Sequence, residues 1–226
     1  ALTNIADQQG NYSMELLRPL NGLLNTQYLI SVYQGESSGG FQIGGGTPQS
    51  NVDEGRFNMV RASNYRQGQS VIAAMREVHQ HNEPKTSPLP AEALLELGDW
   101  HMWHQKRESA TAVYQQAWDE LAALEQGDEL LAHHFGAPQL LPDMQGYNQD
   151  LEPPANIHGQ VKVSFAVNER GRIADMVVLE TEWADEADSE TDPSRLLRRL
   201  RAKFWRPRYE EREPVTTENI VQRYAF

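Results

Sequence analysis

The sequence contains no cysteine, and this absence excludes several classes of protein. Without thiols the chain can form neither a disulfide scaffold nor a zinc ribbon nor an iron–sulfur site, and it has no thiol nucleophile. Runs of about 18 apolar residues, the length needed to cross a bilayer as a helix, are also absent. Apolar residues make up only 39% of the chain, so we expect part of it to be loop or linker.

Signatures of catalysis and metal binding are missing as well. No His-Glu-x-x-His and no Gly-x-Ser-x-Gly motif occurs. The seven histidines include the pairs His79/His81, His101/His104 and His133/His134, but none has a carboxylate at ligand spacing. We interpret these histidines as solvated or packing residues. The sequence therefore predicts no catalytic residues, no metal site and no cofactor, and the protein is not expected to be an enzyme.

Acidic residues outnumber basic residues by 32 to 20, which gives a formal net charge of -12. This balance argues against general nucleic-acid binding, because phosphates must be neutralised by Lys and Arg. Seven acids lie between Glu180 and Asp192, and seven bases follow between Arg195 and Arg208. Such blocks are usually solvated. The alternative is a basic face that docks an anionic partner and is shielded by the acidic loop.

The first part of the chain has the apolar spacing of helices, with steps of three and four residues. The helical patterns cover residues 16–24, 71–78, 91–103, 109–124 and 128–135. Residues 35–50 are rich in glycine and predict a flexible loop. No Lys-Ser/Thr follows these glycines, which argues against a phosphate cradle. A Pro-rich stretch without periodicity predicts a linker at 144–156.

After this linker the apolar period changes to two. Residues 159–168 predict a half-buried strand, 169–172 a hairpin turn with Gly171 at positive φ, and 173–180 a second strand. A helix is predicted to start at Asp192-Pro193 and to be stopped by Pro207, with an apolar stripe of Leu196, Leu197, Leu200 and Phe204. Residues 216–226 predict a last strand. The predicted order is strand, strand, helix, strand.

Two family resemblances rest on these patterns. Leu94, Leu97, Gly98, Ala110, Tyr114 and Ala117 lie at the spacings of a tetratricopeptide repeat. A weaker match includes Ala62, Tyr65 and Ala74, and the helix at 16–24 is a candidate for another unit. Since about three such units are needed for stability, the resemblance implies a domain of irregular α-helical repeats over 1–143, with a groove for protein partners.

Residues 157–226 resemble the C-terminal domain of the TonB family. The matching residues are Gly159, Val161, Val163, Phe165, Val167, Gly171, Ile173, Ala202, Phe204-Trp205-Arg206-Pro207, Glu213-Pro214-Val215, Tyr224 and Phe226. The resemblance implies an α+β protein of two domains, the second a small TonB-like antiparallel sheet with one helix. It also implies the periplasm or cell envelope of a Gram-negative bacterium. The family's membrane anchor and Pro-rich spacer have no counterpart, so we expect a processed or trimmed envelope protein.

From these resemblances we expect a non-catalytic adaptor that binds protein partners, with no nucleic acid and no membrane span. The strand at 216–226 is expected to accept a partner strand at its edge. A homodimer, a structural assembly module and an energy-transducing TonB-type subunit without its anchor are the alternatives. The predicted partner-binding residues are Trp100, Trp103, Tyr114, Trp118, Arg198, Arg201, Arg206, Arg208, Thr217, Ile220, Gln222 and Tyr224.

Overall fold

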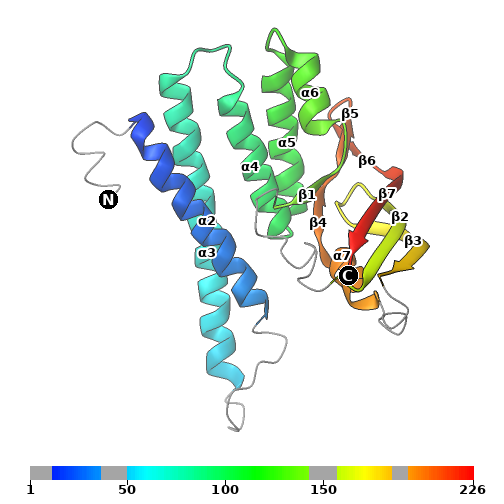
Figure 1. Cartoon of the computed structure of the whole chain (residues 1–226). Helices are drawn as coiled ribbons and strands as arrows, with labels where there is room; N and C mark the ends of the chain where they lie inside the picture. Colours follow the sequence, from blue (N-terminus) through cyan, green and yellow to red (C-terminus); the bar gives the residue numbers. More distant parts are fainter. Residues whose placement is uncertain (1–11, 37–49, 143–156, 185–192) are drawn as a thin grey trace. The chain divides into compact units, whose positions relative to one another are not determined.

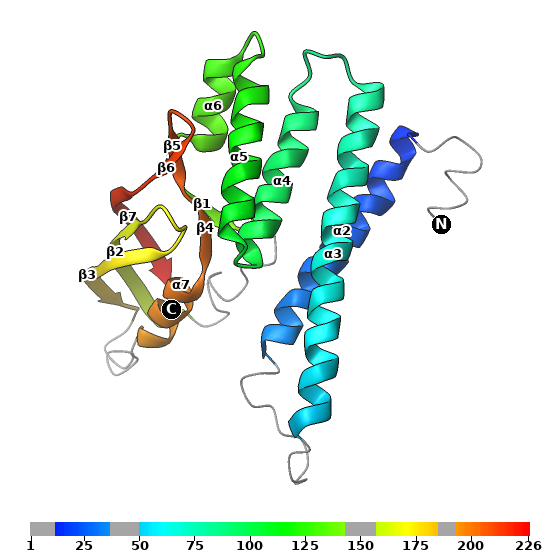
Figure 2. The same cartoon turned by 180° about the vertical axis from the view of Figure 1, so that it is seen from behind.

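The computed structural model describes residues 12–36, 50–142, 157–184 and 193–226. Within these ranges the chain is an α+β protein with six α-helices and several antiparallel strands, as Figure 1 and Figure 2 show from opposite sides. It divides into two compact units, Ala1–Trp100 and His101–Phe226. The predicted linker at 144–156 lies outside the described residues. So does the predicted loop at 35–50, except for its ends, which finish one helix and begin the next.

The first unit is helical. It contains the short 3-10 helix η1 (Met14–Leu16) and the helices α2 (Leu17–Glu36), α3 (Ser50–Asn82) and most of α4 (Leu89–Trp103). The predicted helix is confirmed, and its buried face contains Leu16, Leu20 and Leu24, with Tyr28 one turn further on, whereas Leu23 is exposed. Helices α2 and α3 run antiparallel and side by side in both views.

Trp100 is the centre of the first unit's core. Its side chain is completely buried, and the Tyr28 ring meets it edge-on at 4.8 Å between centroids. The indole Nε1 donates a hydrogen bond of 3.0 Å to the carbonyl of Tyr65. A Cβ atom at Gly68 would overlap the indole ring, so the glycine permits this close approach. Tyr28 donates in turn to Glu96 Oε1 at 2.9 Å.

The second unit begins with α5 (Arg107–Ala122), α6 (Gly127–Phe135) and the strand β1 (Gln139–Leu141). β1 pairs antiparallel with β4 (Phe204–Arg206), and β5 (Arg208–Glu210) pairs with β6 (Glu213–Val215). Tyr209 of β5 packs edge-on against Tyr114 of α5 and Phe135 of α6, with centroid distances of 5.6 and 5.0 Å. Helices α5 and α6 therefore share a core with strands from the end of the chain.

A three-stranded sheet forms the rest of the second unit. Its order is β3 (Ile173–Trp183), β2 (Gly159–Val167), β7 (Thr217–Ala225), all antiparallel. Helix α7 (Ser194–Ala202) buries its leucines in the same core as alternate residues of β2. Gly171 has the predicted positive φ, 65°, and a Cβ there would overlap the carbonyl oxygen of Trp205. For the three-stranded sheet and α7, the predicted order of strand, strand, helix, strand is confirmed, but the short strands β4, β5 and β6, which were not predicted, lie between α7 and β7.

The predicted end of α7 is wrong. The helix ends at Ala202, and Lys203 is extended with ψ 153°, so Phe204 belongs to β4 and not to the helical stripe. The guanidinium of Arg172 donates to the carbonyls of Ala202 and Lys203 at 2.9 and 3.2 Å, and it lies 4.1 Å from the centroid of the Phe204 ring. The Arg172 side chain thus satisfies the carbonyls at the C-terminal end of α7, and the helix ends several residues before Pro207. The predicted N-cap, Asp192, lies outside the described residues.

Candidate functional site

The aromatic residues predicted to line a groove divide between the two units. Trp100 and Tyr114 are completely buried, so their side chains pack in cores and are not accessible. Trp103 and Trp118 are half-buried in the second unit. Their rings lie 5.9 Å from Phe204 and 5.3 Å from Phe135. Intramolecular packing therefore involves all four aromatic side chains.

The four predicted arginines also differ in environment. Arg198 and Arg201 are exposed on α7. Arg206 is buried; its Nη1 donates to the carbonyl of His134 at 3.1 Å, and its guanidinium lies 5.8 Å from the centre of the Tyr114 ring. Arg208 forms an ion pair of 2.6 Å with Glu210. Arg198 and Arg201 are therefore the predicted arginines whose side chains are accessible to a partner.

The four predicted residues of β7 point towards the core side of the sheet. Ile220, Gln222 and Tyr224 stand opposite Phe165, Val163 and Val161, which are all buried, and Thr217 stands opposite Val167. Burial raises the pKa of Tyr224 to about 12. Its hydroxyl donates to the side chain of Gln222. These side chains lie on the face of β7 that is turned towards the core. The residues between them therefore form the outer face of the strand, which is turned towards solvent.

Val221 and Arg223 are the outward residues that the sequence analysis did not select. Val221 and Arg223 alternate along β7 with Ile220, Gln222 and Tyr224, so they lie on the opposite face of the sheet. The alternating apolar residues of β2 were the signal in the sequence that could have shown which face of the sheet is buried. Val221 is 50% exposed. The Arg223 guanidinium pairs with Glu180 at 3.2 Å and Glu182 at 3.5 Å, both on β3. The outer face therefore combines an exposed apolar position with a cluster of ion-paired side chains.

The backbone of β7 offers a free edge. Phe226 and Gly159 exchange two hydrogen bonds, of 3.0 and 3.1 Å, at the end of the β2–β7 ladder. In an antiparallel ladder, residues whose N–H and C=O groups bond to the neighbouring strand alternate with residues whose N–H and C=O groups point away from it. The N–H and C=O groups of Val221, Arg223 and Ala225 consequently point away from β2. Among the described strands β2 is the only neighbour of β7, so these groups lie at the edge of the sheet.

The two edges of the sheet differ in regularity. β3 carries two irregularities, one at Leu179 and one at Asp175, whose φ is 51°. β7 has one irregularity, near Asn219 with φ 56°, and keeps an unbroken register from Ile220 to Ala225. Bulges twist an edge away from a partner strand and are a common protection against unwanted pairing. The β7 edge is therefore the better template for an added strand.

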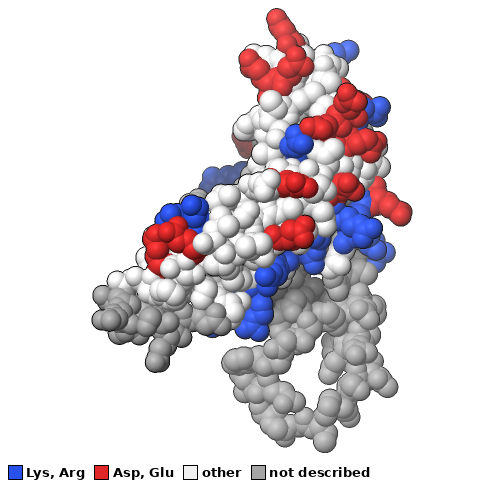
Figure 3. Space-filling view, turned by 90° about the vertical axis from the view of Figure 1, so that its right-hand side faces the viewer, with Lys and Arg blue, Asp and Glu red and all other residues white. Residues whose placement is uncertain are grey.

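Figure 3 is a space-filling view turned by 90° about the vertical axis from that of Figure 1. Asp and Glu side chains gather in the upper part of this view, and many of the Lys and Arg side chains lie below them. Charges of both signs thus occur on one face, but they are not evenly mixed.

Comparisons with protein-family models, with curated proteins and with solved structures found no match. Within the described residues no group of three or more His, Asp or Glu side chains is arranged to hold a metal ion. In the same part of the chain, no helix combines the length and the apolar character needed to cross a membrane. The regular edge of β7 from Ile220 to Ala225 is the feature from which a function can be argued.

Proposed function

We propose that this protein is a non-catalytic adaptor of the bacterial cell envelope that binds an extended segment of a partner protein at the β7 edge. Residues 157–226, which resemble the C-terminal domain of the TonB family, would act as the binding module, and the envelope location rests on that resemblance. The observation that carries the proposal is the unbroken edge of β7, with outward backbone groups at Val221, Arg223 and Ala225. Strand addition supplies affinity through main-chain hydrogen bonds, and neighbouring side chains supply specificity.

Side-chain contacts on both faces hold β7 in the extended conformation that a partner strand would need. Ile220 and Tyr224 pack against the core that α7 and β2 share, which fixes the strand from one face. On the opposite face, the ion pairs from Arg223 to Glu180 and Glu182 connect β7 with the far edge strand across β2. A preformed edge loses little conformational entropy when a partner strand is added.

A proline substitution tests the edge directly. Val221→Pro removes one outward N–H, while the ladder with β2 uses the residues on either side, so the fold should tolerate it. In pull-downs from envelope extract, we expect Val221→Pro to reduce recovery of the bound proteins at least about tenfold, equivalent to about 1.4 kcal/mol. Val221→Thr retains the N–H and should recover the same proteins as the unmodified chain.

A second proline provides the structural reference. Gln222→Pro removes an N–H that faces β2 and should destabilise the sheet itself, which thermal unfolding would report. Equal recovery by Val221→Pro and Val221→Thr would contradict strand addition at this edge. Recovery of cytosolic proteins alone, together with reporter fusions that place the chain in the cytosol, would contradict the envelope assignment.

A further inference from the structure

Helix α7 displays arginines on a rigid support. Leu196, Leu197 and Leu200 are buried in the sheet core, which fixes the orientation of the helix. Its other face carries three exposed arginines, called here the basic face: Arg195, Arg198 and Arg201. No acidic residue lies on α7, and none of the three forms an ion pair with a described residue. Their Cα atoms follow one another at steps of three residues, about 4.5 Å along the axis.

An acidic surface lies on the helices of the same unit. No Lys or Arg occurs from residue 108 to residue 161. At the junction of α5 and α6, three exposed acids form what is called here the acidic turn: Glu125, Asp128 and Glu129. Within the described part of the chain, these three form no ion pair either.

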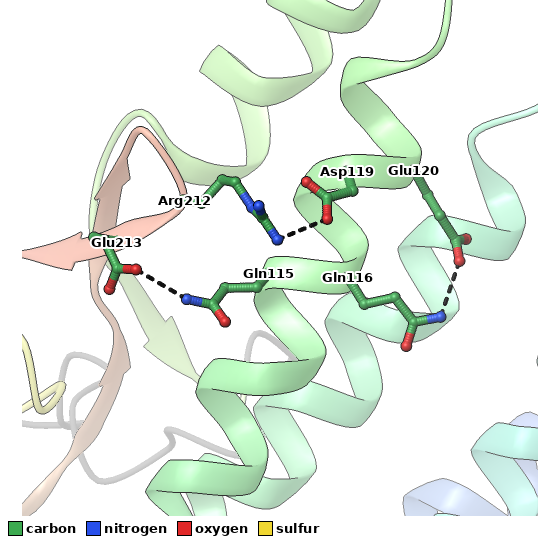
Figure 4. Close-up of polar contacts among 6 residues, drawn as sticks. All are labelled: Gln115, Gln116, Asp119, Glu120, Arg212 and Glu213. Carbon is green, nitrogen blue, oxygen red and sulfur yellow. Dashed lines mark hydrogen bonds and ion pairs between the residues drawn. The ribbon is translucent and has the colours of Figure 1, made fainter.

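Two neighbouring acids do have partners in their own chain, which distinguishes them from the acidic turn. Asp119 forms an ion pair of 2.8 Å with Arg212, and Glu120 accepts a hydrogen bond of 3.0 Å from the side-chain amide of Gln116 (Figure 4). Among the described residues, no ion pair compensates the charges of the basic face or of the acidic turn in this way.

The two surfaces lie at opposite ends of the second unit. In Figure 1 and Figure 2 the α5–α6 junction is at one end of this unit, and α7 is at the other. A single copy therefore cannot bring them together without rearranging its core. Two copies can do so by simple docking.

We propose that the basic face of α7 in one copy binds the acidic turn of a second copy, head to tail. The charges are complementary, three arginines against three carboxylates, and the arginine fork can donate two hydrogen bonds to one carboxylate. Because the two surfaces differ, the contact is heterologous and leaves one surface open at each end of a dimer. Association should therefore continue beyond the dimer as the concentration rises.

Salt dependence is the first test. Exposed ion pairs are individually weak and are screened by salt. In sedimentation velocity on the full chain, we expect a mass that increases with concentration in about 0.01 M NaCl, where the Debye length is about 30 Å. In about 1 M NaCl, where it is about 3 Å, the chain should sediment as a monomer. A monomer at both salt concentrations over the whole concentration range would overturn the proposal.

Charge reversal is the second test. Arg198→Glu/Arg201→Glu and, separately, Asp128→Arg/Glu129→Arg should each weaken self-association at least about tenfold. An equimolar mixture of the two variants should associate again, because each supplies the charge that the other lost. Arg18→Glu/Lys85→Glu is the matched control for the arginine variant, since both residues are exposed in the first unit and two basic residues again become acidic. Circular dichroism verifies that each variant is folded.

The outcomes separate this proposal from the proposed function. If the variants associate like the unmodified chain, or if the mixture of variants remains monomeric, the head-to-tail contact is wrong. Val221→Pro should leave salt-dependent association unchanged, since β7 takes no part in it. Loss of envelope binding with intact self-association therefore locates the defect at the β7 edge. Loss of self-association with intact envelope binding locates it at the basic face or the acidic turn.

Discussion

The two compact units build their cores in different ways. In the first unit the core joins three successive helices, with Trp100 against Tyr28 and Gly68. In the second unit the aromatic core joins Tyr114 and Phe135 to Tyr209, which is more than 70 residues further along the chain. Helices α5 and α6, whose pattern resembles a continuation of the preceding repeats, therefore depend on the last strands for their core. Four changes test this difference, in descending order of expected effect.

Tyr209→Ala should have the largest effect. Removing an aromatic side chain from a core costs about 3–5 kcal/mol. Hydrogen exchange should accelerate in α5 and α6 as well as in the strands, while α2 and α3 keep their protection. Tyr209→Phe keeps the ring and should have a much smaller effect. Unchanged exchange in α5 and α6 would mean that these helices belong with the preceding ones, as the sequence predicted.

Gly68→Ala should produce the converse pattern. The added methyl group overlaps the Trp100 ring, and overpacking of this kind costs about 1–3 kcal/mol. Exchange should accelerate in α2 and α3. Gly22→Ala is the control, because nothing lies within 4 Å of a Cβ there, and the helix should gain up to about 1 kcal/mol. Equal responses of the two variants to denaturant would show that Trp100 does not fill the space beside Gly68.

A smaller effect is expected from His101 at acidic pH. Burial lowers the pKa of this side chain, so the folded state holds it neutral while the unfolded state takes up a proton. Its contribution to stability is therefore present above the ordinary histidine pKa of about 6.5 and is lost as the pH falls through that value. His101→Gln should flatten the decline in unfolding free energy between about pH 7.5 and pH 5.5. An unchanged slope would assign the decline to other groups.

Arg212→Ala should have the smallest effect. The ion pair between Arg212 and Asp119 joins two side chains that are each 52% exposed, and such pairs contribute about 0.2–1 kcal/mol. The loss should disappear in high salt. Arg18→Ala, an exposed arginine of α2, gives the background for removing one positive charge. A loss well above 1 kcal/mol would mean that this pair fixes the β5–β6 hairpin on α5 more firmly than its exposure suggests.

Several elements could be read from the sequence because their signals are local. Alternation at Val161, Val163, Phe165 and Val167 predicted β2, and the turn at Gly171 needs the positive φ that glycine accepts. The short strands β1, β4, β5 and β6 were not predicted. With three residues each they have no detectable period, and they pair with segments that become neighbours only after folding.

The candidate site was predicted only in part for the same reason. The last strand could be selected as a sheet edge from the expected topology. Its outward-facing residues, Val221 and Arg223, could not. The residues that were predicted instead, Thr217, Ile220, Gln222 and Tyr224, face the core side. A one-residue change in register exchanges the two faces of a strand, and register is fixed by the neighbouring strand.

The sequence by itself determined the absence of thiol chemistry, the excess of negative charge and the positions of the longer helices and strands. These depend on residue types and on periods of two or about 3.6 residues, which are properties of short segments. Three features depend on the tertiary structure: α5 and α6 share a core with β5, Trp100 and Tyr114 are buried, and β7 has one irregularity where β3 has two. These properties arise from contacts between residues distant in sequence, and no local pattern specifies them.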